Sequence, residues 1–428
     1  MSRARERFVA AFSVLAIRDM RRVWASQVLS EVGDWAARFA LAILVYDRSG
    51  SAFLTAAVLA VTYVPYLLSP IITPIAQRYS LRRMMIASDV LRMALFTLIA
   101  MPLPVWSLLL LAFAAGLATP PFEAARTAII PEAAGEARMA DGYALSSVTF
   151  QTAQALGLAV GGTLLFLIGA QAALILNAAS FGVSAVLLYR IKAGRQPPPP
   201  EPPTTRTRNA FTLMARRGLL RQMLTFFLLL ALADAAISAL LPVWLRSSGV
   251  NPILMATLIA IAPLIGAFSG AIVPREGSPI RLMRISCTVT ILAASPAAVL
   301  FALAGKSSMV VLLTLAAVIA YGVTIAADVP TMTGSMMIVP EHLRAPFVSI
   351  VQPGLMGVQA AGALGAGVLA SLLPTTSTMA IALIVPVAYS SWALLRTLPP
   401  AEIDLRTGVP SELDSTPESE SASRNSVT

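Results

Sequence analysis

Long apolar runs recur along the entire chain, and they limit its fold more than any other feature of the sequence. Each run is about as long as the ~20 residues that an α-helix needs to cross the hydrocarbon layer of a bilayer. Only 12% of the residues are charged, whereas an average soluble domain has about 25%. A soluble fold would have to bury all of this apolar surface in one core, so we expect an all-α membrane protein.

The sequence predicts twelve transmembrane helices. They are expected at residues 23–46, 52–76, 84–103, 105–126, 143–168, 171–191, 219–245, 252–273, 282–304, 309–333, 347–372 and 376–397. The resulting domains are an N-terminal segment (1–22), a six-helix bundle (23–191), a proline-rich linker (192–218), a second six-helix bundle (219–397) and a disordered polar tail (398–428).

The distribution of basic residues predicts the orientation in the membrane. If both termini lie inside, the outer loops hold only Arg48, Arg246 and Lys306, while most of the 31 Lys and Arg residues fall in the inner segments. The positive-inside rule therefore favours a multi-pass protein of the cell membrane with both termini in the cytoplasm. The net charge of +10 then faces anionic lipid, and nucleic-acid binding is not indicated.

The two halves of the chain carry similar spacings, which indicates an internal duplication. Small residues and an arginine at Ser69, Thr73 and Arg78 have counterparts at Gly266, Gly270 and Arg275, each 197 positions later. Arg138 precedes Gly161 by the same 23 residues that separate Arg344 from Gly367. Six plus six helices in a parallel repeat are the architecture of secondary transporters of the major facilitator kind.

Short motifs strengthen this comparison by their order and spacing. They comprise Trp24, Gln27, Ser30, Gly33 and Asp34; Ser88, Asp89 and Arg92; Ala125, Arg126, Ala128 and Pro131; Gly157, Gly161 and Gly162; and Pro340, Glu341 and Arg344. With them, the chain resembles the major facilitator superfamily over residues 15–397. It looks closest to the drug-exporter-like branch that includes macrolide-efflux and siderophore-export proteins.

The resemblance and the positions of polar residues in the spans predict a set of gate and conformational residues. These are Arg78, Arg82, Arg83, Asp89, Arg92, Glu123, Arg126, Gly157, Gly161, Gly162, Asp328 and Arg344. Asp89 and Arg92 are expected to pair, and for Glu123 and Asp328, late in spans four and ten, a binding role stays equally open. The chain departs from the family pattern at Thr73 and Gln77, where the inner loop usually has Gly and Asp, and at Leu158, where the family has Pro. These departures weaken the expected inner-gate charge pair and the expected bend of the fifth span.

Three ionisable residues fall inside the first predicted span. If this span begins near Val23, Asp34 lies ~16 Å along the helix, near the middle of a ~30 Å hydrocarbon core. Arg38 follows Asp34 by four residues, so the two are expected to pair, and Glu31 extends the same stripe. Charge at that depth is functional by default, which predicts that Asp34 and Glu31 take part in proton coupling. A static pair that fixes the rotation of the helix is the alternative.

Asp234 is the expected counterpart of Asp34 in the second half. Counted from Gln222, it lies ~18 Å into the seventh span, and no basic residue lies within one turn of it. An unpaired acid at that depth is expected to be neutral in one state and exposed in another. We therefore predict Asp234 as a further proton-coupling residue.

Polar and aromatic side chains near these acids predict a substrate cavity. The expected lining residues are Trp35, Arg38, Phe39, Phe150, Gln151 and Gln154. Such a lining would suit a cationic or neutral lipophile through apolar and cation–π contacts. Packing against a neighbouring helix is the alternative for the two glutamines.

Residues for other chemistry are scarce in this sequence. With one His, His342, and one Cys, Cys287, the chain offers neither a His/Cys metal cluster nor a disulfide. The only Gly-Lys-Ser stretch lacks the first glycine of a phosphate-binding loop, because Leu300 occupies that position. We therefore expect no enzyme activity and no cofactor, and we expect an ion gradient to supply the energy.

Together these features predict a monomeric secondary transporter that binds protons and a small molecule and works by alternating access. Export and proton coupling are implied mainly by the family resemblance. Two alternatives stay open at this point. One is an importer or facilitator of a small metabolite, and the other is a membrane receptor or lipid-handling protein that has kept the fold without transport.

Overall fold

The computed structural model describes residues 12–69, 71–72, 79–193, 212–214, 218–274, 276–305 and 309–396. Within these ranges the chain is helical and contains no strand, as predicted. The predicted positions Thr73, Gln77, Arg78 and Arg275, most of the linker and the tail lie outside the described residues.

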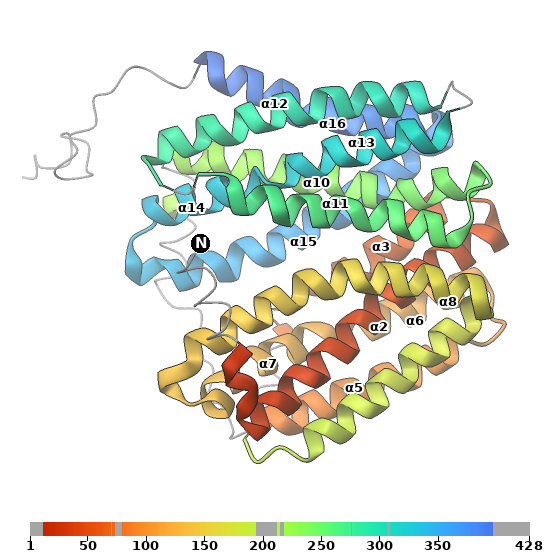
Figure 1. Cartoon of the computed structure of the whole chain (residues 1–428), viewed down its shortest axis with the longest axis vertical. Coiled ribbons are helices and arrows are strands. Elements are labelled where there is room, and N and C mark those ends of the chain that lie inside the picture. Colours follow the sequence, from red (N-terminus) through yellow and green to blue (C-terminus); the bar gives the residue numbers. More distant parts are fainter. Residues whose placement is uncertain are drawn as a thin grey trace, which may run out of the picture.

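The first half contains α2 to α8 and the second half α10 to α16 (Figure 1). In the first half, the short η1 (Val14–Ala16) is followed by α2 (Arg18–Ser49), α3 (Ala52–Leu67), α5 (Leu81–Ile99), α6 (Val105–Leu117), α7 (Thr119–Ala134), η2 (Glu136–Arg138) and α8 (Met139–Tyr189). The second half has α10 (Gly218–Ser247), α11 (Pro252–Ile272), α12 (Pro279–Ala304), α13 (Val310–Ile325), α14 (Asp328–Ile338), α15 (Glu341–Leu372) and α16 (Thr375–Arg396).

These helices account for the twelve predicted crossings once their breaks are taken into account. Helices α6 and α7 form one crossing, and α13 and α14 form another. Helix α8 covers two crossings, because Gly169 takes φ 81° and ψ 170° and reverses the chain between them. The turn predicted at 169–171 is therefore confirmed. By length and composition, eight helices in the described part of the chain are long and apolar enough to cross a membrane.

Local sequence explains how the short connections begin and end their helices. Gly50 ends α2 in the left-handed region at φ 62°, which glycine adopts without steric cost. The Ser51 side chain then accepts a hydrogen bond from the Leu54 amide and caps α3. Asn251 caps α11 in the same way through the Leu254 amide. Several helices extend beyond their predicted spans, because apolarity marks only the part of a helix that lies in lipid.

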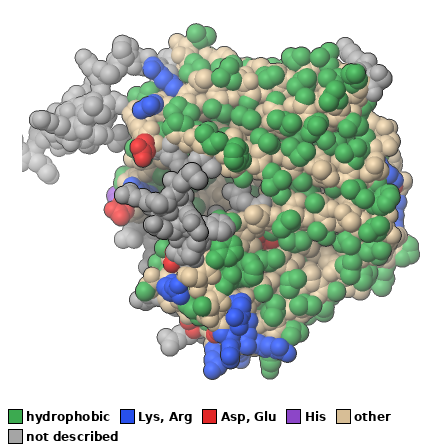
Figure 2. All heavy atoms as spheres, in the orientation of Figure 1, with side chains coloured by type: hydrophobic (Ala, Val, Ile, Leu, Met, Phe, Trp, Pro, Cys, Tyr) green, Lys and Arg blue, Asp and Glu red, His purple; other side chains and the backbone are tan. Residues whose placement is uncertain are grey.

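The two halves pack side by side and meet mainly through α3 against α15 and α8 against α11. We call the end of the molecule where α2 begins the proximal end, and the end where α2 finishes the distal end. On the face seen in Figure 2, hydrophobic side chains cover the middle, and many Lys and Arg side chains gather towards the proximal end. This distribution fits a body that is surrounded by lipid.

Glycines bring the backbones of the two halves into direct contact near the distal end. A Cβ atom on Gly162 would lie 2.6 Å from the Pro252 carbonyl oxygen, and one on Gly367 would lie 3.0 Å from the Phe53 Cα atom. A hydrogen-bonded ion pair between Arg246 and Asp47, with an N–O distance of 2.7 Å, also joins the halves there. The distal end is closed by these contacts.

Neighbouring glycines on α8 and α15 reveal the duplication in three dimensions. Gly157 packs against the Val32 carbonyl and Gly362 against the Leu232 carbonyl, and in both cases a Cβ would lie 2.7 Å from the oxygen. The equivalent of Gly367 is Gly162, since each faces the opposite half. Gly161, which the spacing of arginines had matched to Gly367, packs instead on Ala36 within its own half.

Substituting Gly367 by Ala is expected to open the distal end. The added methyl group has no space against Phe53, and overpacking of this kind costs about 1–3 kcal/mol, which shifts a two-state population roughly tenfold. Double electron–electron resonance between labels on the two distal loops would detect a longer distance.

Gly365→Ala is the matched control, because a Cβ at Gly365 on the same helix meets nothing within 4 Å. If both variants give the wild-type distance distribution, the backbone contact does not hold the distal end closed.

Candidate functional site

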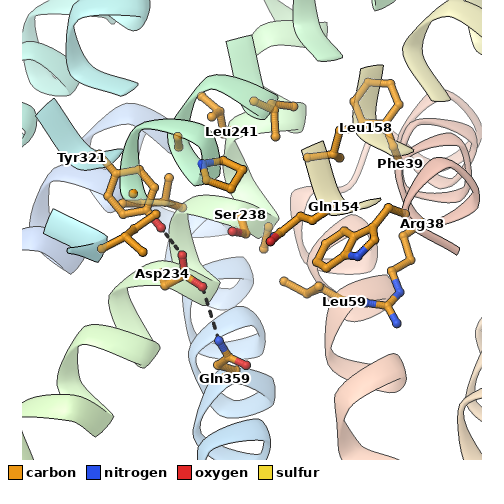
Figure 3. A pocket seen from close by; sticks show the side chains of 18 of the residues that line it. Arg38, Phe39, Leu59, Gln154, Leu158, Asp234, Ser238, Leu241, Tyr321 and Gln359 are labelled. Atoms are coloured by element: carbon orange, nitrogen blue, oxygen red, sulfur yellow. Dashed lines mark hydrogen bonds between the residues drawn. The ribbon is translucent and has the colours of Figure 1, made fainter. Parts of the chain in front are cut away.

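A cavity of about 660 Å³ lies between the two halves (Figure 3). Its volume falls within the roughly 300–1,000 Å³ of typical small-molecule sites. Five residues predicted from the sequence line it, namely Trp35, Arg38, Phe39, Phe150 and Gln154. The side chain of Gln151, the sixth, lies outside the described part of the structure. The cavity extends from Leu158 towards Gly270 and Val329, on the proximal side of the glycine contacts.

Asp234 lines this cavity from α10 and is held by neutral groups. The Tyr321 hydroxyl donates a hydrogen bond to one carboxylate oxygen, and Gln359 Nε2 donates to the other at 3.3 Å. Figure 3 shows all three side chains on one wall. No basic side chain forms an ion pair with Asp234 in the described ranges. Its charge is therefore not compensated by the protein.

Tyr321 and Gln359 were not predicted from the sequence. Each lies in an otherwise apolar span, and the packing of α13 and α15 against α10 is what brings them to Asp234. A search for polar residues in those spans would have found the two positions, but helix periodicity alone gives no contact between separate helices.

Asp328, for which the sequence left a gate role and a binding role open, also lines the cavity. The crossing is broken between α13 and α14, and Asp328 is the first residue of α14. This break exposes the side chain to the cavity rather than to the proximal surface. Asp328 lies within electrostatic range of Asp234, so this wall holds two carboxyl groups.

Asp34 does not pair with Arg38, and this prediction is wrong. Its carboxylate lies 3.4 Å from Arg92 Nη1 on α5. Arg92 also donates to Asp89 at 2.5 Å, which confirms the predicted pairing of these two residues, and Asp89 accepts a further hydrogen bond from Ser184. Asp34 is directed to α5 and is not among the residues that line the cavity. We call Asp34, Asp89, Arg92 and Ser184 the Arg92 network.

Burial explains why the Arg92 network is tightly paired. Asp89 is completely buried and Arg92 is 2% exposed. The guanidinium carbon lies 4.4 Å from the ring centroids of both Phe122 and Phe181, so cation–π contacts replace part of its hydration. A buried charge of this kind requires close ionic partners, which Arg92 has at its two terminal nitrogens.

Glu31 belongs to a second polar cluster, between α2, α7 and α8. It forms an ion pair with Arg126 and accepts a hydrogen bond from Gln27 Nε2 at 3.0 Å. Gln27 in turn bonds to Ser146. Glu31 is absent from the cavity lining, as is Glu123, which accepts a hydrogen bond from the Tyr66 hydroxyl at 2.9 Å.

Arg38 enters the cavity without an ionic partner. Its guanidinium carbon lies 4.9 Å from the Trp35 ring centroid. Among the described residues, no carboxylate lies within 4.0 Å of its nitrogen atoms. In Figure 3, Arg38 and Asp234 lie on opposite sides of the cavity.

The remaining predicted gate residues lie at helix ends and interfaces. Arg82 donates to the Ile191 carbonyl at 2.9 Å, which ties α5 to the end of α8. Arg83 and Arg344 are exposed. Gly157 and Gly161 pack on α2, and Gly162 packs on α11. The roles predicted for these residues in gating stay predictions.

The repeat explains why Asp34 and Asp234 differ in their partners. Val32 and Leu232 occupy equivalent contacts, so Asp34 and Asp234 are equivalent as well, 200 positions apart. Helices α5 and α12 begin at Leu81 and Pro279, an offset that aligns Asp89 with Cys287 and Arg92 with Thr290. All four side chains are buried. The second half thus has no cation where the first has Arg92.

Comparisons with known proteins agree with this architecture. The family model for the Major Facilitator Superfamily matches residues 23–351. The chain therefore belongs to the Major Facilitator Superfamily of transporters. No curated protein matches the sequence significantly.

Solved structures of transporters have the same fold. The nucleoside transporter NupG aligns with a TM-score of 0.66 and 13% identity over 89% of this chain and 98% of its own. A POT family transporter in complex with 5-aminolevulinic acid gives 0.67 and 14% over 88% and 96%. A bacterial homolog of the human lysosomal transporter Spinster, in an inward-facing conformation, gives 0.67 and 14% over 90% and 98%.

In the part of the chain that the structure describes, no three His, Cys, Asp or Glu side chains gather closely enough to hold a metal ion. Cys287 is buried and unpaired. Most acidic groups of the described interior belong to the cavity wall or to the two ion-paired clusters, and Glu123, bonded to Tyr66, lies outside both.

Removing the Arg92 side chain is expected to destabilise the protein strongly. In Arg92→Gln, Asp89 loses its ionic partner while it stays buried, which costs about 3–5 kcal/mol. In Arg92→Gln/Asp89→Asn, the part of the loss that comes from Asp89 should be recovered, while Asp34, which is less buried, still lacks its cation. Thermal melting of the purified transporter in detergent measures the difference. Equal melting temperatures for the two variants would contradict this account of the network.

Proposed function

We propose that this transporter is a proton-coupled exporter of hydrophobic or amphipathic small molecules. It would work by alternating access, as the two halves rock about the central cavity. The single observation that carries the proposal is Asp234, a carboxyl group on the wall of a substrate-sized cavity with no basic partner in the described residues.

The chemistry of Asp234 supports proton exchange. A carboxylate without a cation is costly in a low-dielectric interior, so it gains from binding either a proton or a positively charged group of the substrate. Asp328 would share this role, because it lies on the same wall. Asp34 and Glu31 are already ion-paired, so we assign proton exchange first to Asp234.

The proposed direction of transport rests on the resemblance to the drug-exporter-like branch, and the orientation in the membrane says which side the cavity faces. We propose that the proximal end faces the cytoplasm, since the predicted inner segments hold most of the Lys and Arg residues. The closed distal end then faces outwards, and the cavity takes up substrate from the cytoplasm or the inner leaflet.

Transport in inverted membrane vesicles with an imposed pH gradient tests this function. Wild type should accumulate a fluorescent amphiphilic amine or a neutral dye in the vesicle lumen, and collapse of the gradient should abolish the accumulation. Asp234→Asn should lower gradient-driven uptake at least about tenfold, because a single side chain in proton transfer contributes roughly that much or more.

Glu341→Gln is the matched control, since Glu341 is exposed at the start of α15. Unchanged uptake after collapse of the gradient would favour a facilitator, movement in the opposite direction an importer, and binding without flux a receptor. Full activity of Asp234→Asn at every pH would remove Asp234 from the coupling mechanism.

A further inference from the structure

The cavity walls carry opposite charges, and the repeat shows where this asymmetry arises. The equivalence of Val32 and Leu232 also makes Arg38 equivalent to Ser238, and both residues line the cavity. The first half therefore contributes a cation where the second contributes a hydroxyl. The second half contributes an uncompensated carboxylate where the first has one bound by Arg92.

The Arg38 guanidinium has no ion-pair partner within 4.0 Å among the described residues. Asp34, Tyr63, Tyr66 and Glu123 lie within electrostatic range of it. Neither acid forms an ion pair with Arg38, because Asp34 is bound by Arg92 and the Glu123 carboxylate accepts a hydrogen bond from the Tyr66 hydroxyl. Within the described ranges, the Arg38 guanidinium lies over the face of Trp35. Such a group, facing a largely apolar cavity, favours an anion with which it can form two parallel hydrogen bonds.

The opposite wall favours a cation. Asp234 and Asp328 lie within electrostatic range of each other, and only neutral side chains donate to Asp234. Figure 3 shows Arg38 and Asp234 on opposite sides of the cavity, so the positive and negative sites are separated. Tyr63 also lines the cavity, within electrostatic range of both Arg38 and Asp234.

We infer that the cavity binds a dipolar amphipathic molecule with its two charges at opposite ends. Its anionic group would contact Arg38, its cationic group would contact Asp234 and Asp328, and an apolar body would lie between them over Trp35, Tyr63 and Leu241. This inference rests on the proposed function only in taking the cavity as the site of the transported molecule.

A molecule with a single charge would fit these walls less well. A monovalent cation binds the acids but leaves Arg38 desolvated without an anion. A monovalent anion binds Arg38 but leaves the acids desolvated without a cation. A dipolar molecule avoids both costs. Each charge-assisted contact should be worth about tenfold to a hundredfold in affinity.

Equilibrium binding to the purified full-length transporter in nanodiscs, without any gradient, tests the inference. The probes are biphenyl carboxylic acids with an ω-aminoalkyl chain of graded length, together with the methyl ester and the N-acetyl derivative of each. At one chain length or more, the dipolar probe should bind at least about tenfold tighter than both derivatives. If no length shows this preference, the inference is wrong.

Two substitutions should separate the contributions of the anionic and cationic ends of the probe to its binding preference. Arg38→Gln should abolish the advantage over the methyl ester and keep the advantage over the N-acetyl derivative. Asp234→Asn should do the reverse, with Asp328→Asn as a second variant if Asp234→Asn fails to fold. Arg38→Lys should restore part of the lost preference. Arg284→Gln, an exposed arginine near the start of α12, is the matched control and should bind like wild type.

These outcomes are distinguishable from a failure of the proposed export. If the binding pattern holds while vesicles show no proton-driven uptake, only the export proposal fails. If vesicles export a singly charged amine and Arg38→Gln does not change the binding preferences, export stands and the dipolar site is overturned.

Discussion

An ionisable side chain in the hydrocarbon layer must be neutralised by a partner or be able to meet water or substrate. In the first half this condition is met by one arginine, since Arg92 serves both Asp34 and Asp89. The equivalent position in the second half is Thr290, which leaves Asp234 to two neutral donors. Equivalent positions in the two halves thus hold an ion-paired carboxylate, Asp34, and a carboxylate without a cation, Asp234. The difference in charge between the two cavity walls depends on this contrast.

The fold was predictable because membrane helices are encoded in local composition. Runs of apolar residues gave the twelve crossings, and Gly169 marked a chain reversal that the structure contains. The breaks before Thr119 and Asp328 were missed, although Pro120, Pro121 and Pro330 follow them, because only the apolar length of each run was used to place the spans. The extensions of helices beyond the bilayer were also missed, since polar turns carry no comparable signal.

The candidate site was predictable only in part. Counting along single helices selected Asp234 and five further residues that the structure places on the cavity wall. The partner of Asp34 could not be predicted in this way, because a spacing of four residues makes Arg38 a local candidate but says nothing of Arg92, 58 residues away. The contacts of Tyr321 and Gln359 with Asp234 could not be predicted either, since all three lie on different helices. Contacts between helices depend on the rotation of each helix about its axis, and this rotation cannot be read from a single sequence.

The backbone contacts at Gly162 and Gly367 have a consequence for the speed of the cycle. Where two interlocking side chains must separate, each needs to find its rotamer again before the surfaces can rejoin. A contact made mainly of backbone and Ala side chains needs no such search, so in the proposed cycle the halves could separate and rejoin in one register. The exposed Asp47–Arg246 pair adds little attraction but fixes the lateral position. A surface that adheres weakly and rejoins in one position would suit a transporter that opens this end at every turnover.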